Sequence, residues 1–262
     1  MTAALAPARA ATTSSLPRWV RLAGWYVLGH CYLLGPALVI GLVLLAVVLG
    51  ILDARGVDIR SSGMQVLLQV AVWLPFGVAI HYAVNWLGPQ LAAGLTRRSF
   101  VKASVASAFG IALVAALAQL LLLNLEAWVY QARGWTADGF DGVALAPEAT
   151  SLTALFGLTL MITAAALSGT LVGLSFVRLR AWATLLLPAT VGPLLAVFGL
   201  ALDPATMFVP IQFGGGDAGR WSPENIGLGG WAGGVLGLAV VASMIVAIHL
   251  TARRLPIRGV RA

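Results

Sequence analysis

Six long stretches without a charged residue dominate the pattern of the chain. They cover residues 22–52, 61–96, 103–125, 149–177, 181–202 and 225–252, and each is mainly apolar. A helix crosses the hydrocarbon layer of a membrane with about 20 residues, and every stretch is longer than that. The pattern predicts an all-α membrane protein with six transmembrane helices, at about 25–52, 64–87, 103–125, 151–176, 182–201 and 229–250.

The composition agrees with a chain surrounded by lipid. Hydrophobic residues make up 60% of the 262 residues and charged residues only 10%, compared with about 25% in a soluble domain. The chain therefore has too few polar residues to cover a soluble core. The net charge of +7 does not indicate a nucleic-acid partner, because the basic residues are scattered between apolar stretches. The single cysteine, Cys31, excludes an intrachain disulfide.

The charges between the stretches predict the orientation. When successive connections are assigned to alternate sides, one side receives twelve basic residues and no acidic residue. The other side receives four basic residues and all nine acidic residues. Because cytoplasmic loops carry the excess of Lys and Arg, both termini are expected in the cytoplasm. The richness in Arg, Ala and Gly is typical of a bacterial source, so we expect a multi-pass protein of the bacterial cytoplasmic membrane.

The domain organisation is simple. Residues 1–15 are small and polar and are expected to be disordered, whereas residues 16–262 form a single six-span transmembrane domain. Residues 16–24 are either a short interfacial helix or the basic flank of the first span. The third outer loop, at about 202–228, contains an apolar segment that could re-enter the membrane.

Catalytic and cofactor signatures are missing from the sequence. A P-loop needs a lysine after a glycine, but the single lysine, Lys102, follows Val101. His30, His81 and His249 lie on three different spans with no acidic residue near them in the sequence. We therefore expect no catalytic residue, no bound cofactor and no metal ligand set in this chain.

A few polar side chains interrupt the apolar spans. They either line a translocation path or form hydrogen bonds between helices, and the sequence leaves both readings open. These residues are Gln69, Gln119, Asn124 and Thr163.

The loop between the second and third spans is the most informative segment. Gly88 and Pro89 are expected to end the second span, and residues 89–93 can form a short helix along the membrane surface. Gly94 would end this short helix. Thr96 or Ser99 would cap the third span. An ordinary basic loop explains the charges here, but it does not explain a short helix bounded by Gly-Pro and Gly.

The residues after this helix carry a resemblance to a known family. The segment AGLTRRSF, residues 93–100, resembles the G-[VL]-[TS]-R-R-x-F segment of bacterial ABC-2-type exporter permeases. The resemblance covers about a dozen residues in motif and nearly the whole chain in its plan of spans and loops. It implies that residues 88–100 are a cytoplasmic coupling helix that docks on a separate ATPase subunit. The residues implied in coupling are Gly94, Leu95, Thr96, Arg97, Arg98 and Phe100.

The same resemblance implies the partners. Two ATPase subunits would bind and hydrolyse ATP, and a second permease copy would complete either a homodimer or a heterodimer. Membrane lipids are the remaining expected partners. Leu95 and Phe100 are the expected apolar contacts with the ATPase.

Two alternatives come from other classes of protein. One is a membrane scaffold or accessory subunit without enzymatic activity. The other is a rhomboid-like intramembrane serine protease, suggested by Ser168-Gly169 on span four, His249 on span six and His81 on span two. Ser168 lies about 25 Å below the outer surface at 1.5 Å per residue, which is too deep for a site open to outside water. Close packing of small residues explains Ser168 and its neighbours better.

The charge pattern generates a topology prediction. In a Cys31→Ser background and intact cells, an impermeant thiol reagent should label a cysteine at position 138 and leave one at position 178 unlabelled. The reverse pattern, or labelling of both positions, would contradict six spans with cytoplasmic termini.

Overall fold

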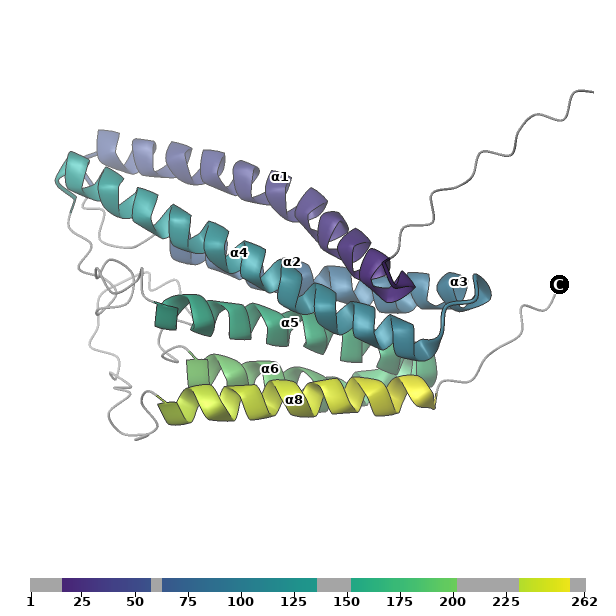
Figure 1. Cartoon of the computed structure of the whole chain (residues 1–262). Coiled ribbons are helices and arrows are strands. Elements are labelled where there is room, and N and C mark those ends of the chain that lie inside the picture. Colours follow the sequence, from purple (N-terminus) through teal and green to yellow (C-terminus); the bar gives the residue numbers. More distant parts are fainter. Residues whose placement is uncertain (1–15, 58–62, 136–151, 202–230, 255–262) are drawn as a thin grey trace, which may run out of the picture.

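The described part of the computed structural model covers residues 16–57, 63–135, 152–201 and 231–254, and all its regular elements are helices (Figure 1). The order is α1 (Arg18–Ala54), α2 (Met64–His81), the π-helix η1 (Tyr82–Trp86), α3 (Leu87–Ala92), α4 (Arg97–Arg133), α5 (Leu152–Leu179), the 3-10 helix η3 (Arg180–Leu186), α6 (Leu187–Ala201) and α8 (Trp231–Arg253). The predicted N-terminal disorder and the third outer loop lie outside the described residues.

Five helices are long and apolar enough to cross a membrane. They cover Arg18–Ala54, Val66–Ala92, Arg97–Arg133, Ala154–Leu179 and Gly234–Arg253. The all-helical, membrane-type architecture predicted from the sequence is therefore confirmed in the described residues. The segment expected to form the fifth of six spans contains only a shorter apolar helix, Trp182–Val197. Two prolines, Pro188 and Pro193, lie in this segment and remove backbone hydrogen bonds.

The second span does not end at Gly88 and Pro89, contrary to the sequence-based expectation. The helix continues from α2 through η1 into α3, which contains both residues. Pro89 lies inside this continuous helix, directly after the π-helical turn, and its missing N–H leaves one backbone hydrogen bond of the helix unmade. The π-helical turn η1 lies just before α3 and locally changes the hydrogen-bond pattern of the helix. The short helix α3 therefore extends α2 (Figure 1).

The first and third spans are also longer than the charge-free stretches. Helix α1 begins at Arg18, so the proposed interfacial segment and the first span form one helix. Helix α4 extends to Arg133, and Glu126 therefore belongs to a helix, not to the outer loop expected to begin there. Each helix has 37 residues, or about 55 Å at 1.5 Å per residue, which exceeds the hydrocarbon thickness.

Helix α5 is the centre of the bundle. It packs against α2, α4, α6 and α8, and residues 160–172 are almost all buried. Two of its glycines, Gly169 and Gly173, face α2 at a spacing of four residues. A Cβ at Gly169 would overlap the carbonyl oxygen of Phe76, and a Cβ at Gly173 would overlap Ala83. The predicted close packing of small residues around Ser168 is therefore confirmed.

The helices gather their basic residues at one end of the bundle. The start of α1, helix α3, the start of α4 and the end of α8 lie together there (Figure 1). We call this the basic end, because its described charged residues are all basic. They are Arg18, Arg21, Arg97, Arg98, Lys102, Arg178, Arg180, Arg253 and Arg254. The described acidic residues, Asp53 and Glu126, lie toward the opposite end, so the charge separation in the sequence corresponds to a separation in space.

The close approach at Gly169 predicts the effect of one methyl group. Gly169→Ala should lower the free energy of unfolding by roughly 1–3 kcal/mol, because α5 or α2 must move to accommodate the Cβ. Gly77→Ala is the matched control, since nothing lies within 4 Å of a Cβ there and alanine favours a helix over glycine by up to about 1 kcal/mol. Thermal unfolding in detergent measures both variants. Equal melting temperatures would contradict the packing of α5 on α2 at this point.

Candidate functional site

The turn between α3 and α4 is built by two local capping motifs. Gly94 has a φ of 81°, a conformation that suits glycine. Its N–H donates to the Leu91 carbonyl at 3.1 Å, and the Leu95 N–H donates to the Gln90 carbonyl at 3.0 Å. This pair of bonds is the Schellman motif that ends a helix. The Thr96 hydroxyl then accepts from the Ser99 N–H at 3.1 Å and caps α4. The expected roles of Gly94 and Thr96 in the backbone are confirmed.

The side chains of this turn divide into buried and accessible groups. Phe100 is buried, with 1% of its surface exposed, and packs in the core of the bundle. The expectation that Phe100 contacts a partner is therefore wrong for this structure, because α4 directs its ring inward. Leu95 is half-buried and Arg98 is exposed. Arg97 donates from Nη1 to the Arg253 carbonyl at 2.8 Å and connects the start of α4 to the end of α8.

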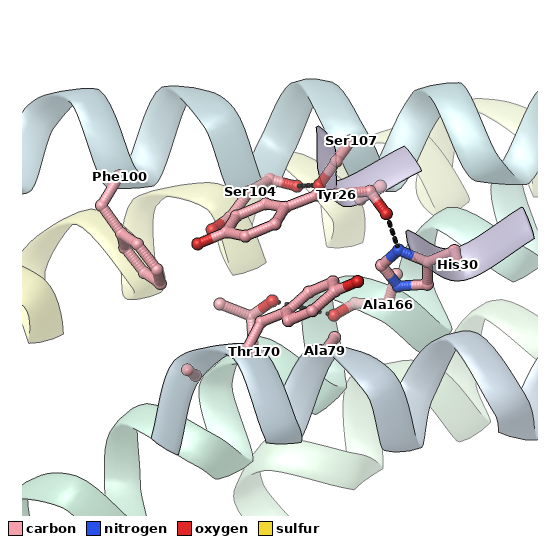
Figure 2. Close-up of a pocket in the computed structure, with 11 residues that line it drawn as sticks. Tyr26, His30, Ala79, Phe100, Ser104, Ser107, Ala166 and Thr170 are labelled. Atoms are coloured by element: carbon pink, nitrogen blue, oxygen red, sulfur yellow. Dashed lines mark hydrogen bonds between the residues drawn. The ribbon is translucent and has the colours of Figure 1, made fainter. Parts of the chain in front are cut away.

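A small cavity lies just inside this turn, between α1, α2, η1, α4 and α5 (Figure 2). Its volume is about 10 Å³, close to the minimum that one water molecule needs. We call it the inner cavity. Six of its eleven lining residues have a polar side chain, but the surface that they expose to the cavity is mainly apolar. The polar residues around it are Tyr26, His30, Tyr82, Ser104, Ser107 and Thr170.

Tyr26 connects the inner cavity to α3. Its hydroxyl donates to Oε1 of Gln90 at 2.9 Å, and both side chains are buried. The Tyr26 ring also stacks on the Tyr82 ring, with centroids 4.4 Å apart and planes inclined by 14°. Trp25 extends this aromatic group outward, because its ring meets Trp86 edge-on at 5.0 Å. The N-terminal part of α1 is therefore joined to both η1 and α3.

His30 occupies the opposite side of the inner cavity. Its Nδ1 lies 2.7 Å from the carbonyl oxygen of Tyr26. A carbonyl can only accept, so in the neutral ring Nδ1 carries the proton and Nε2 is an acceptor. Nε2 is buried and has no hydrogen-bond partner. The carbonyl of Pro75 is a second backbone hydrogen-bond partner of the ring.

The four polar residues proposed for a translocation path do not line this cavity. Gln69 is half-buried and accepts from Nε1 of Trp73 at 3.0 Å. Gln119 is buried, and its Nε2 donates to the Met64 carbonyl at 2.7 Å. Asn124 is exposed and bonds to the Leu120 carbonyl of its own helix. The Thr163 hydroxyl is buried without a hydrogen-bond partner. The bond between Gln119 and α2 supports the packing interpretation for that residue.

Glu126 forms the second polar centre, toward the opposite end of the bundle. Among the described residues it is the one acidic side chain that is buried, with 4% of its surface exposed. Its Oε1 accepts from the N–H groups of Gly63 at 2.6 Å and Met64 at 3.2 Å. Helix α2 has no side-chain cap of its own at Gly63, so a carboxylate from α4 caps it. The N-terminus of a helix favours a negative charge in this position.

The groups expected of a rhomboid-like protease are arranged unfavourably for that chemistry. The Ser168 hydroxyl is fully buried and donates to the Thr190 carbonyl on α6. A nucleophilic serine needs a base that accepts its proton. Nδ1 of His81 pairs instead with the Asn85 amide at 2.9 Å. In the described part of the chain, no group of three His, Cys, Asp or Glu side chains could bind a metal ion.

Sequence reasoning did not identify Tyr26, Gln90, Ser104, Ser107 or Glu126 as a set. Weak signals were present, because Tyr26 and His30 are four residues apart and Ser104 and Ser107 three apart, spacings that share a helix face. Gln90 and Glu126 had no such signal, since Gln90 was expected in a short helix along the membrane surface and Glu126 in an outer loop. In the structure Gln90 lies in α3, which continues α2, and Glu126 lies within α4.

The buried carboxylate generates a stability prediction. Glu126→Leu should lower the free energy of unfolding by about 1–3 kcal/mol, because two backbone N–H groups of α2 lose their acceptor. Glu126→Gln keeps an acceptor oxygen and should recover part of the loss. Asn124→Leu is the matched control on an exposed face of the same helix. Unfolding in detergent at a series of denaturant concentrations measures the three variants, and equal effects of the two leucine variants would exclude the cap.

No family model matches the sequence of this chain, and neither a curated protein nor a solved structure matches it.

Proposed function

We propose that this chain is the membrane-spanning permease subunit of an ABC-type exporter. A separate ATPase subunit, in two copies, hydrolyses the ATP, and a second permease copy completes the assembly. The chain itself then needs no catalytic residue. Conformational change in the ATPase moves the α3–α4 turn and shifts the helices between states open to either side of the membrane.

The proposal includes a six-span topology in the bacterial cytoplasmic membrane. The basic end lies in the cytoplasm, as the excess of Arg and Lys favours. Residues 180–201 form the additional crossing, in which η3 and α6 together supply 22 residues, about the number that a membrane requires. Both termini are then cytoplasmic.

The observation that carries the proposal is the construction of the α3–α4 turn. The motif residues 93–100 form a doubly capped corner at the basic end, and the helix that precedes it continues from α2. A segment that transmits force must keep its shape, and the two caps stabilise the helix ends on either side of the turn. The bond from Arg97 to the end of α8 attaches the same corner to a distant helix.

The burial of Phe100 changes the surface expected to meet the ATPase. The accessible part of the turn consists of Ala92, Ala93, Gly94, Thr96 and Arg98. Small residues let another backbone approach closely, and the Arg98 guanidinium can pair with carboxylates. The partner surface is therefore expected to be flat and acidic.

A non-transporting accessory subunit is the second candidate. The observation in its favour is that the inner cavity has room for about one water molecule, while Gln69, Gln119, Asn124 and Thr163 lie outside its lining. A transporter in a closed state has the same appearance, so the ATPase partner distinguishes the two candidates.

Co-purification from native membranes tests the proposed function. The tagged chain should retain an ATP-hydrolysing subunit, and Arg98→Glu should reduce the amount retained roughly tenfold, equivalent to about 1.4 kcal/mol. Arg21→Glu is the matched control, because Arg21 is exposed at the same end but on α1. Phe100→Ala should lower the melting temperature of the chain, since it removes a buried ring. The absence of any ATPase with the wild-type chain would overturn the proposal.

A further inference from the structure

One face of α2 and η1 exposes polar side chains along a helix that is long and apolar enough to cross a membrane. We propose that this face is the docking surface for a second copy of this chain, and that His81 and Asn85 form hydrogen bonds between the two copies. The inference rests on the proposed function for the presence of a second permease copy, and it names the surface that this copy occupies.

A spacing of four residues places the members of this face next to one another on the helix surface. They are Gln69, Trp73, Gly77, His81 and Asn85, and we call them the exposed row. Gln69 is half-buried and the other four are exposed. Nε1 of Trp73 donates to Oε1 of Gln69 at 3.0 Å. Nδ2 of Asn85 donates to Nδ1 of His81 at 2.9 Å. The row therefore consists of two hydrogen-bonded pairs, with a glycine between them.

The depth of the exposed row makes contact with lipid unfavourable. Asn85 lies 16 positions after Gln69, or about 24 Å at 1.5 Å per residue, and this length fits within a hydrocarbon layer of about 30 Å. Lipid chains form no hydrogen bonds, so imidazole and amide groups that face them lose the partners that water would supply. The exposed residues of α1 between 39 and 51 show what lipid favours, because all are Val, Ile, Leu, Ala or Gly. A protein surface is therefore expected to cover the exposed row.

The His81–Asn85 pair is complementary to a second copy of itself. Because the Asn85 amide donates to Nδ1, the neutral His81 ring carries its proton on Nε2. The pair therefore presents one donor, the Nε2–H of His81, and one acceptor, Oδ1 of Asn85. A two-fold axis brings the same patch of two subunits together. The His81 ring of each copy can then donate to Asn85 of the other copy, which gives two reciprocal hydrogen bonds.

Matching depth in the membrane favours a second copy over an unrelated chain. Two copies insert with their basic ends on the same side, so a two-fold axis normal to the membrane places equivalent residues at the same depth. The donor and acceptor of the His81–Asn85 pair also lie at similar depths, because the two side chains meet at 2.9 Å. The other pair, Gln69 and Trp73, begins 12 positions earlier, about 18 Å along the helix. A second copy supplies polar groups at both depths, whereas an unrelated helix would need the same spacing.

Cysteine cross-linking in native membranes tests the docking surface. Gly77→Cys in a Cys31→Ser background places a thiol within the exposed row and removes no polar side chain, and nothing lies within 4 Å of a Cβ there. A short bis-methanethiosulfonate reagent should link two copies of this variant. Leu113→Cys is the matched control, because Leu113 is exposed on α4 and lies 16 positions from the basic end of its helix, compared with 15 for Gly77. Equal cross-linking of both variants, or a product with a different protein at position 77, would overturn the second copy.

Resonance energy transfer between purified chains in lipid vesicles tests the reciprocal hydrogen bonds. Asn85→Leu removes both acceptors and should raise the dissociation constant of the dimer roughly tenfold, because each hydrogen bond between membrane helices changes such a constant about threefold. Asn124→Leu is the matched control, since Asn124 is also an exposed asparagine that bonds within its own helix, to the Leu120 carbonyl. Equal constants for the two variants would overturn the proposed bonds.

The docking surface and the proposed function fail in different ways. The vesicle measurement contains no ATPase, so it reports on the contact between copies alone. A chain that retains an ATPase but does not cross-link at position 77 would overturn the docking surface and leave the exporter proposal intact. A chain that pairs through the exposed row but retains no ATPase would support the docking surface and overturn the exporter proposal.

Discussion

The fold depends on how closely the backbones of α5 and α2 approach each other. In lipid, apolar side chains gain little by leaving their surroundings, so helices associate through tight packing. Gly169 and Gly173 allow α5 to contact the carbonyl groups of α2 directly. This contact fixes the position of α2, and the inner cavity and the α3–α4 turn lie at the end of that helix.

Hydrogen bonds from polar side chains then connect the helices at the two ends of the bundle. Glu126 caps α2 from α4 toward one end, and Gln90 accepts from Tyr26 at the basic end. Asp53 strengthens the first of these ends, because it pairs with Arg133 at 3.3 Å and accepts from Trp135 at 3.2 Å. Each bond joins two different helices or helix ends. The hydrogen bonds therefore determine register, while the packing of α5 determines proximity.

Sequence alone predicted the features that depend on local chemistry. The apolar stretches identified the helices, the charges identified their common end, and Gly94 and Thr96 identified the corner between α3 and α4. The helix ends were less predictable, because α4 extends through the charged residues Glu126 and Arg133. A charged residue marks the end of the segment that lies in the hydrocarbon layer, but the helix itself can continue beyond that residue. The burial of Phe100 and the pairing of Gln90 depend on tertiary packing, which no pattern within one segment records.

The π-helix η1 sets the direction in which α3 presents its side chains. A π-turn contains one residue more than an α-helical turn, and each residue of an α-helix rotates the chain by about 100°. If the same residues Tyr82–Trp86 formed a regular α-helix, they would carry the chain about one residue further around the helix axis and rotate α3 by about that angle relative to α2. Gln90 would then point away from Tyr26, and the accessible face of the α3–α4 turn would move to another side of the bundle. The extra residue therefore acts as a fixed angular offset between the membrane helix and the corner at its end.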